Sequence, residues 1–458
     1  MHNDKMHSEA RASVSAEHQY LGMNKNIIYG LQHVLTMYGG IIAPPIIIGA
    51  AAGLEASEIG LLVAAALFVG GIATMLQTLG FKHFGAKLPI VQGVSFAGVA
   101  TILAIVTTGG GLASAFGAVI VASLIGLLLA PFFSKIIRFF PPVVTGCVIT
   151  MIGISLLPVA IRWMMGGNPK AENWGDPANI GLAAMTLAIV IIFSMLKSQL
   201  IRRLAILMAI VLGTIIASLA GFADFSKVAN GSMFAFPHIF HFGMPVFEFT
   251  AILSMVIVTL VIMTETTADI IAIGEIVGSK VDSKRIGDGL RADMLSSAVA
   301  PIFGSFMQTA FAQNVGLVAI TGIKSRFVVA TAGGILVVLG LLPIVGRLVA
   351  AIPMPVLGGA GIVLFGTVAA SGIRTLAKVD YNDQKNLIIV ATSLAIGMIP
   401  IANHEFYAQF PKWVSTLLHS GISSACITAI LLNILFNHLP FTKKSVETTT
   451  LPINSGHS

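Results

Sequence analysis

Long apolar stretches, separated by short polar or Gly/Pro-rich breaks, dominate the sequence from residue 26 onward. A helix needs about 20 apolar residues to cross a bilayer, so these stretches predict membrane-spanning segments. We expect fourteen of them, at 26–48, 57–79, 92–106, 112–131, 142–160, 179–196, 203–221, 250–273, 287–303, 310–322, 326–345, 355–372, 386–401 and 418–437. Two of these stretches, 92–106 and 310–322, are too short for a full crossing, which predicts interrupted helices there.

Composition supports an all-α polytopic membrane protein. The residues AVILMFWYC make up 56% of the chain, charged residues only 10%, and the mean hydropathy is +0.93. A soluble domain carries roughly 25% charge, so a soluble enzyme, a disordered chain and a disulfide scaffold are excluded. Long apolar runs also disfavour a transmembrane barrel, whose strands alternate apolar and polar residues. The sequence contains no metal-binding or cofactor-binding motif, and we expect neither group.

The distribution of basic residues predicts the orientation. Numbered from an inner N-terminus, the inner segments carry twenty of the 26 Lys and Arg residues, and the outer loops carry five. Basic residues concentrate in the cytoplasmic loops of membrane proteins. The pattern predicts a multi-pass protein of the cell (inner) membrane, with cytoplasmic tails at 1–24 and 438–458.

An internal repeat relates the two halves of the chain. The segment PVVTG at 142–146, followed by Gly153, recurs as PVLGG at 355–359, followed by Gly366, at a constant offset of 213 residues. A repeat that contains seven spans, an odd number, must be inverted in the membrane. Inverted repeats are typical of secondary transporters, which bind substrate where corresponding helices of the two halves are broken. The short segments 92–106 and 310–322 are third in each half.

Ionisable residues inside predicted spans are the first candidates for function. Glu265 and Asp269 are four residues apart, which places both carboxylates on one helix face. Asp293 is a further acid in a predicted span, suited to carrying a proton. The structural alternatives are a polar pair bonded to a neighbouring helix for Glu265 and Asp269, and a salt bridge with Arg291 or a lysine for Asp293.

Three polar uncharged candidates complete the set. Gln313 and Asn314 open the second short segment, and an amide offers both a donor and an acceptor to a planar heterocycle. The alternative is that these amides only satisfy the interrupted backbone. His33 lies within the first span, where a hydrogen-bonded packing role competes with a role in proton relay.

Several motifs of the chain resemble those of the nucleobase–ascorbate transporter family, in its xanthine and uric acid permease branch. The resemblance is carried by QNVGxxxxTG at 313–322, LQHV at 31–34, QGVSF at 92–96 and the Glu265/Asp269 pair, and it covers about 26–437. It implies fourteen spans, arranged as two inverted repeats of seven. It also implies a homodimer and the coupling of purine uptake to protons. It also implies a core domain at 25–131 and 250–345, and a gate domain at 132–249 and 346–437.

The resemblance also assigns roles to individual residues. The expected substrate-binding residues lie on the eighth span and at the two broken segments: Glu265, Gln313, Phe96, Ala312, Asn314 and Ser95. The expected proton-coupling residues are Asp293, Asp269 and His33. Gln313 stands where uracil-type members have Glu, which favours xanthine and urate. Ser95 replaces an Asn of some xanthine-selective relatives, which leans toward urate or dual use.

Other classes of transport protein remain as alternatives. A uracil-type or other nucleobase symporter would share the motifs. A sulfate-permease-like anion carrier would share the architecture but would usually add a cytosolic domain of on the order of 100 residues, more than the predicted C-terminal tail supplies. A channel would not accumulate substrate against a gradient.

Overall fold

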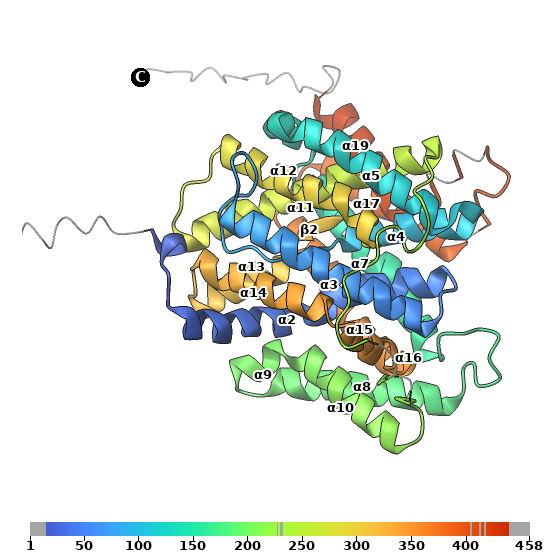
Figure 1. The fold of residues 1–458 in the computed structure, drawn as a ribbon. Coiled ribbons are helices and arrows are strands. Elements are labelled where there is room, and N and C mark those ends of the chain that lie inside the picture. Colours follow the sequence, from blue (N-terminus) through green and yellow to red (C-terminus); the bar gives the residue numbers. More distant parts are fainter. Residues whose placement is uncertain are drawn as a thin grey trace, which may run out of the picture.

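The computed structural model describes residues 15–226, 228–229, 232–403, 405–411, 414–415 and 418–438. The predicted N-terminal tail up to residue 14 and the predicted C-terminal tail from 439 lie outside these residues. Figure 1 shows helices throughout the described chain, as the apolar stretches predicted.

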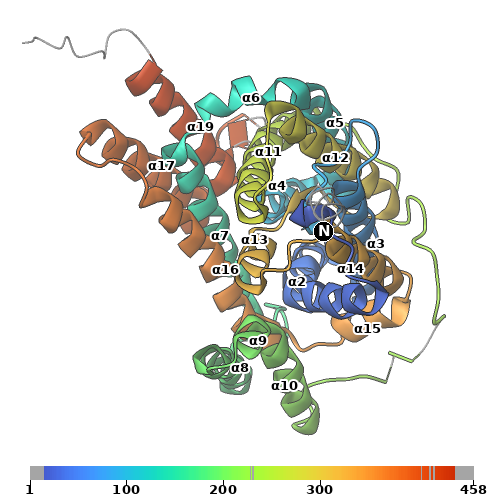
Figure 2. The same ribbon diagram turned by 90° about the vertical axis from the view of Figure 1, so that its left-hand side faces the viewer.

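The helices form two packed groups, which Figure 2 separates into a compact cluster and a more open wall. The first group contains α2 (Met23–Ala51), α3 (Ala56–Leu79), α4 (Phe96–Ile105), α5 (Gly111–Leu129), α11 (Phe249–Val277), α12 (Ser283–Val299), α13 (Ala312–Thr321), α14 (Arg326–Gly340) and α15 (Pro343–Ala350). The second contains α7 (Pro142–Met164), α8 (Pro177–Met195), α10 (Ala205–Leu219), α16 (Met354–Leu376), α17 (Gln384–Ala402) and α19 (Gly421–Asn433). The short helices α6 (Phe133–Ile136) and α9 (Gln199–Arg203) lie in connections.

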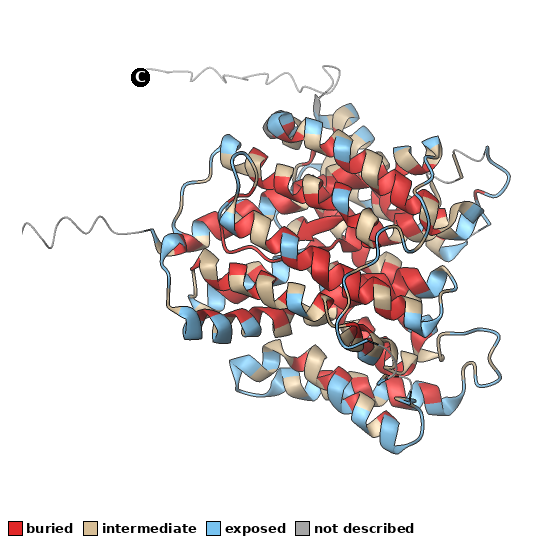
Figure 3. Cartoon of the chain, in the orientation of Figure 1, coloured by how far each residue is buried: buried red, intermediate tan, exposed pale blue. Residues whose placement is uncertain are grey.

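Each predicted span overlaps a helix, but the helices differ in length. Among the described residues, eight helical segments are long and apolar enough to cross a membrane, or nine if a bent pair counts as one span. The predicted short segment at 310–322 corresponds to α13, which contains ten residues. At 92–106, α4 also contains ten residues, but it continues through Val106–Gly110 into α5, and Phe96–Phe132 forms one apolar helical stretch of 37 residues. Burial is deepest inside the first group, and the outer faces of α8 and α10 are exposed (Figure 3).

The prediction of a continuous span at 326–345 is wrong. The helix ends at Gly340, and α15 leaves it at an angle of 79°. Pro343 opens α15, and a proline cannot donate the backbone hydrogen bond that would continue α14. The bend places α15 against α3.

Helices α7 and α16, which carry the repeated segments, cross in close contact. Both contain 23 residues. A Cβ on Gly153 would overlap the backbone nitrogen of Ala369, and one on Gly372 would overlap that of Thr150. Small residues at such positions let membrane helices approach at backbone distance, which replaces the hydrophobic effect as the source of packing energy.

The crossing predicts that Gly153 and Gly366, which occupy equivalent positions in the repeat, tolerate an added methyl group differently. We expect Gly153→Ala to lower thermal stability, because the added methyl forces the helices apart and overpacking costs about 1–3 kcal/mol. Gly366→Ala is the matched control, because a Cβ there meets nothing within 4 Å. The measurement is the melting temperature of each purified variant in detergent; equal losses in both variants would contradict the close crossing.

The start of the described chain is fixed to the end of α11. The Glu17 carboxylate accepts a hydrogen bond of 2.6 Å from the Ser279 hydroxyl and lies 3.6 Å from Arg285. Burial alone would raise the pKa of Glu17, but the Ser279 hydrogen bond and the Arg285 charge hold this pKa below its ordinary value. Residues 15–18 are thereby tied to the α11–α12 turn.

Candidate functional site

The two short helices begin at a crossing of two extended segments. β1 (Gln92–Val94) pairs antiparallel with β2 (Gln308–Ala310), with Gly93 opposite Thr309. The Ser95 N–H donates to the Met307 carbonyl at 2.8 Å, and the Phe311 N–H donates to the Val91 carbonyl at 3.1 Å. These bonds satisfy backbone groups that would be costly inside a membrane.

Each strand leads directly into a helix, α4 at Phe96 and α13 at Ala312. The free N–H groups of a helix start carry partial positive charge and can bind a polar ligand. Ala312 and Gln313 are exposed at the start of α13, so this helix end is open. Gln313 is therefore available to a ligand.

Glu265 and Asp269 lie on α11, which packs against both α4 and α13. Both side chains are half-buried. In the part of the chain that the structure describes, the ion pairs join Arg285 to Glu17 and Arg291 to Asp288. Neither carboxylate is thus neutralised by a basic residue, and both remain free for a ligand or a proton.

Asp293 is fully buried at the junction of three helices. Its carboxylate accepts hydrogen bonds from the Thr266 hydroxyl of α11 at 2.6 Å and from the Gln77 amide of α3 at 3.0 Å. Arg291, the alternative partner considered from sequence, pairs with Asp288 instead. A proton on Asp293 would therefore alter a hydrogen-bond network and not a salt bridge.

Sequence reasoning missed Gln77. Its amide nitrogen also contacts the Gly289 carbonyl at 3.3 Å, and its amide oxygen accepts from the Ala86 N–H at 2.9 Å. The side chain is fully buried. The available signal was a lone amide within the predicted span 57–79, but nothing in the sequence paired it with Asp293.

We expect Gln77→Met to lower thermal stability, because the change leaves one Asp293 oxygen and the Ala86 N–H without their partner. An unsatisfied buried group costs about 1–3 kcal/mol of stability. Thr78→Val is the matched control, because the Thr78 hydroxyl donates to carbonyls of its own helix. The melting temperature of each purified variant is the measurement, and equal losses in the two variants would contradict a stabilising role for the Gln77 bonds.

The Asn314 amide is bonded within the protein. Its oxygen lies 2.8 Å from His33 Nδ1, and its nitrogen donates to the Pro89 carbonyl at 2.7 Å. Asn314 and His33 are both buried. The bond to Pro89 is of the kind expected for an amide that satisfies interrupted backbone, and the bond to His33 is of the kind expected for a packing histidine.

Ser95 and Phe96, at the start of α4, also contact other parts of the protein. The Ser95 hydroxyl caps α4 by accepting from the Ala97 N–H at 3.2 Å, and the side chain is buried. The Phe96 ring meets the Phe365 ring of α16 edge-on, with centroids 6.1 Å apart. Phe96 thereby connects the start of α4 to the second helix group, whereas Ser95 shapes the helix start.

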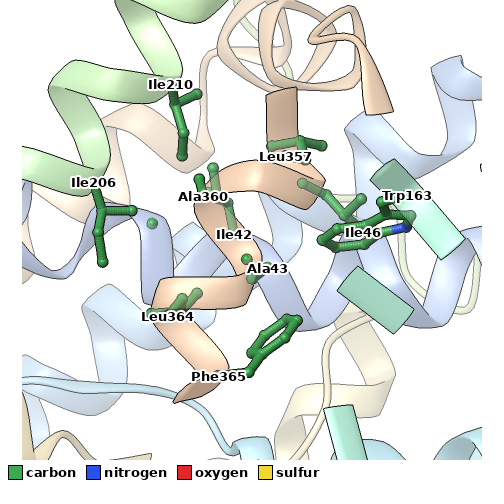
Figure 4. A pocket seen from close by; sticks show the side chains of 12 residues that line it. Ile42, Ala43, Ile46, Trp163, Ile206, Ile210, Leu357, Ala360, Leu364 and Phe365 are labelled. Carbon is green, nitrogen blue, oxygen red and sulfur yellow. The ribbon is translucent and has the colours of Figure 1, made fainter. Parts of the chain in front are cut away.

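An apolar pocket lies between the two groups (Figure 4). Its walls come from α2, α7, α10 and α16: Gly39, Ile42, Ala43, Ile46, Trp163, Ile206, Ile210, Leu357, Ala360, Gly361, Leu364 and Phe365. The acids and amides described above are not among its lining residues. Phe365 borders both this pocket and Phe96.

A family model described as "Permease family" matches residues 24–406. The chain belongs to this family. The resemblance identified from the QNVGxxxxTG motif is confirmed, and so is the prediction of a transport protein and not an enzyme.

Similar curated proteins extend over nearly the whole permease. The uric acid transporter UacT of Escherichia coli (strain K12) is 40% identical, over 95% of this chain and 92% of its own. The xanthine permease of Bacillus subtilis (strain 168) is 37% identical, over 92% of this chain and 96% of its own. Together with the apolar helices, these matches identify a multi-pass membrane protein.

Solved structures share the fold at low identity. The transmembrane domain of the cyanobacterial bicarbonate transporter BicA matches with a TM-score of 0.58 at 17% identity, covering 89% of the permease and 98% of that chain. The structure of SLC26A9 matches with a TM-score of 0.61 at 13% identity, covering 95% and 70%. The permease therefore has a helical membrane-transporter fold.

Proposed function

We propose that this permease imports xanthine, uric acid or both across the cytoplasmic membrane, by alternating access coupled to protons. The observation that carries the proposal is that an unpaired acid, Glu265, lies on α11 and an exposed amide, Gln313, lies at the start of α13, on helices that pack together. Similarity to a uric acid transporter and a xanthine permease supports the substrate class.

The chemistry of this pair suits an oxidised purine. Such a ring alternates C=O and N–H groups along its edge. The Glu265 carboxylate can accept from two N–H groups, and the Gln313 amide supplies one donor and one acceptor. The open N–H groups at the start of α13 add donors for ring carbonyls. Phe96, at the start of α4, offers an aromatic surface beside the same region.

The proposed architecture has fourteen spans in two inverted sevens, with both termini in the cytoplasm and a homodimer as the assembly. The equal lengths of α4 and α13, and of α7 and α16, support the repeat. In this proposal the first helix group is the core domain, spanning 25–131 and 250–345. The second group is the gate domain, spanning 132–249 and 346–437.

Proton coupling is proposed to use the acids Asp293 and Asp269, near the proposed substrate site. Asp293 is joined by Thr266 to α11, the helix that carries Glu265 and Asp269. A protonation change at Asp293 can therefore reach the substrate-binding helix through one hydroxyl. His33 contributes by holding Asn314, and through it the first turn of α13.

The test is uptake of labelled xanthine, urate and uracil into cells that express the permease, with and without a protonophore. We expect saturable uptake of xanthine or urate, with uracil at least tenfold poorer. A tenfold preference needs about 1.4 kcal/mol, which one mismatched buried hydrogen bond supplies. Uracil uptake equal to both purines would favour a uracil-type symporter, and uptake unaffected by the protonophore would argue against proton coupling.

A further inference from the structure

The segment between α10 and α11 has an unusual composition for a connection outside a helix. Residues 228–247 read VANGSMFAFPHIFHFGMPVF, without one Asp, Glu, Lys or Arg. Figure 2 shows this connection leaving α10 and running along the outside of the first helix group. Residues 232–247 are referred to below as the strap.

The strap is fixed to the first group by backbone hydrogen bonds along its length. Ala235 N–H donates to the Leu341 carbonyl at 3.1 Å, and Phe240 N–H donates to the Ile302 carbonyl at 2.8 Å. Val246 N–H donates to a carbonyl on α5 at 2.9 Å. The strap therefore follows three different elements and has a defined inner face.

Aromatic side chains on that inner face pack onto the helices. The Phe236 ring meets the rings of Phe68 and Phe303 at 5.1 and 5.8 Å between centroids. The Phe242 ring lies 6.5 Å from that of Phe116. These contacts account for part of the apolar content of the strap and leave the rest facing outward.

The outward face is apolar as well. Its large exposed side chains are Met233, Phe234, Ile239, Met244, Val246 and Phe247. Leu219, the last residue of α10, is 85% exposed, but residues 220–231 between it and the strap carry Asp224 and Lys227. Phe249, the first residue of α11, follows the strap after Glu248 and is 76% exposed. The exposed apolar residues of the strap thus lie next in sequence to the exposed apolar start of α11.

Another connection of the permease shows what a water-facing loop looks like. The segment between α7 and α8 carries Lys170, Glu172 and Asp176, and Lys170 is exposed. Exposed apolar side chains gathered in one segment mark a contact with membrane or protein. The absence of charged residues from the strap and the exposed apolar start of α11 that follows it favour lipid.

We propose that the strap is a lipid-contacting belt of the first helix group, with Phe234, Met244 and Phe247 inserted at the membrane interface. Irregular backbone is tolerated at the interface and not in the hydrocarbon centre, because its polar groups need partners. Pro237 and Pro245 have no N–H to satisfy, and the bonded N–H groups of Ala235 and Phe240 reduce the cost further. The proposal does not depend on the identity of the substrate.

The experiment uses the full-length permease in phospholipid nanodiscs, with an environment-sensitive fluorophore on single introduced cysteines. Phe234→Cys, Met244→Cys and Phe247→Cys report on the strap. Leu219→Cys is the lipid-facing control and Lys170→Cys the water-facing control. Unsubstituted protein controls for the native Cys147 and Cys426, both fully buried.

We expect lipids with a doxyl group at carbon 5 to quench all three strap positions to at least half the extent seen at Leu219→Cys. Quenching by aqueous iodide should be at least threefold weaker than at Lys170→Cys. Strong iodide quenching with no doxyl quenching would overturn the proposal in favour of a water-exposed strap. Quenching by neither reagent would overturn it in favour of a protein contact, such as a second copy of this chain.

Discussion

Glu265→Gln should lower purine uptake more than tenfold while the protein remains in the membrane. The substitution keeps the shape of the side chain but removes its charge and half of its acceptor capacity. A hydrogen bond to a charged group contributes about 1.5–3 kcal/mol, which corresponds to roughly a tenfold to hundredfold loss. The measurement is initial uptake of labelled xanthine and urate at several concentrations, normalised to the amount of permease in the membrane.

The same helix supplies the control for this experiment. Glu275 lies near the end of α11 and is exposed to solvent. Glu275→Gln makes the identical chemical change away from α4 and α13 and should leave uptake near the unsubstituted level. Unchanged kinetics in Glu265→Gln would remove Glu265 from the binding site, whatever the control shows.

Asp293→Asn should abolish accumulation of substrate and leave substrate binding at least partly intact. The asparagine imitates a permanently protonated aspartate. Its oxygen can still accept from the Gln77 amide, and its NH2 group can donate to the Thr266 hydroxyl, so the junction of α3, α11 and α12 stays hydrogen-bonded with one bond reversed. What is lost is the change of charge that, in the proposed mechanism, couples movement to the proton gradient.

The measurement for Asp293→Asn is paired. Equilibrium binding of purine to the purified variant reports on the site, and uptake driven by an imposed pH gradient reports on coupling. Asp288→Asn is the matched control on the same helix, because Asp288 pairs with Arg291 at the edge of the network. Accumulation by Asp293→Asn in response to the gradient would exclude Asp293 as the coupling residue and favour the Glu265/Asp269 pair.

The helical stretches could be predicted because hydrophobicity along one segment is a local property. The short α4 and α13 were predicted for the same reason. The bend after Gly340 was missed, although Pro343 marks it, because the apolar run continues through the proline. The strap was also missed as a structural element, since its form depends on bonds to Leu341 and Ile302, far from it in the sequence.

For the site residues, the sequence allowed prediction of which residues matter but not of the partners they bond to. Residue type and position inside a span were enough to single out Glu265, Asp269 and Asp293. Partner choice was not available from the sequence, because it depends on which helices meet. Gln77 and Asp293 are 216 residues apart, and the sequence did not show that the Asn314 amide bonds to His33 and Pro89.

The hydrogen bond between His33 and Asn314 means that the residues which face the site and the residues which orient them need not be the same. Gln313 is the neighbour of Asn314, so the rotation of the first turn of α13 is set partly by a side chain 281 residues earlier. In the proposed site, the hydrogen-bonding groups presented to a purine therefore depend on residues in two distant parts of the chain. A change of substrate preference during evolution could begin at position 33, whose side chain bonds to Asn314, and natural variation at positions 33 and 314 is best compared jointly.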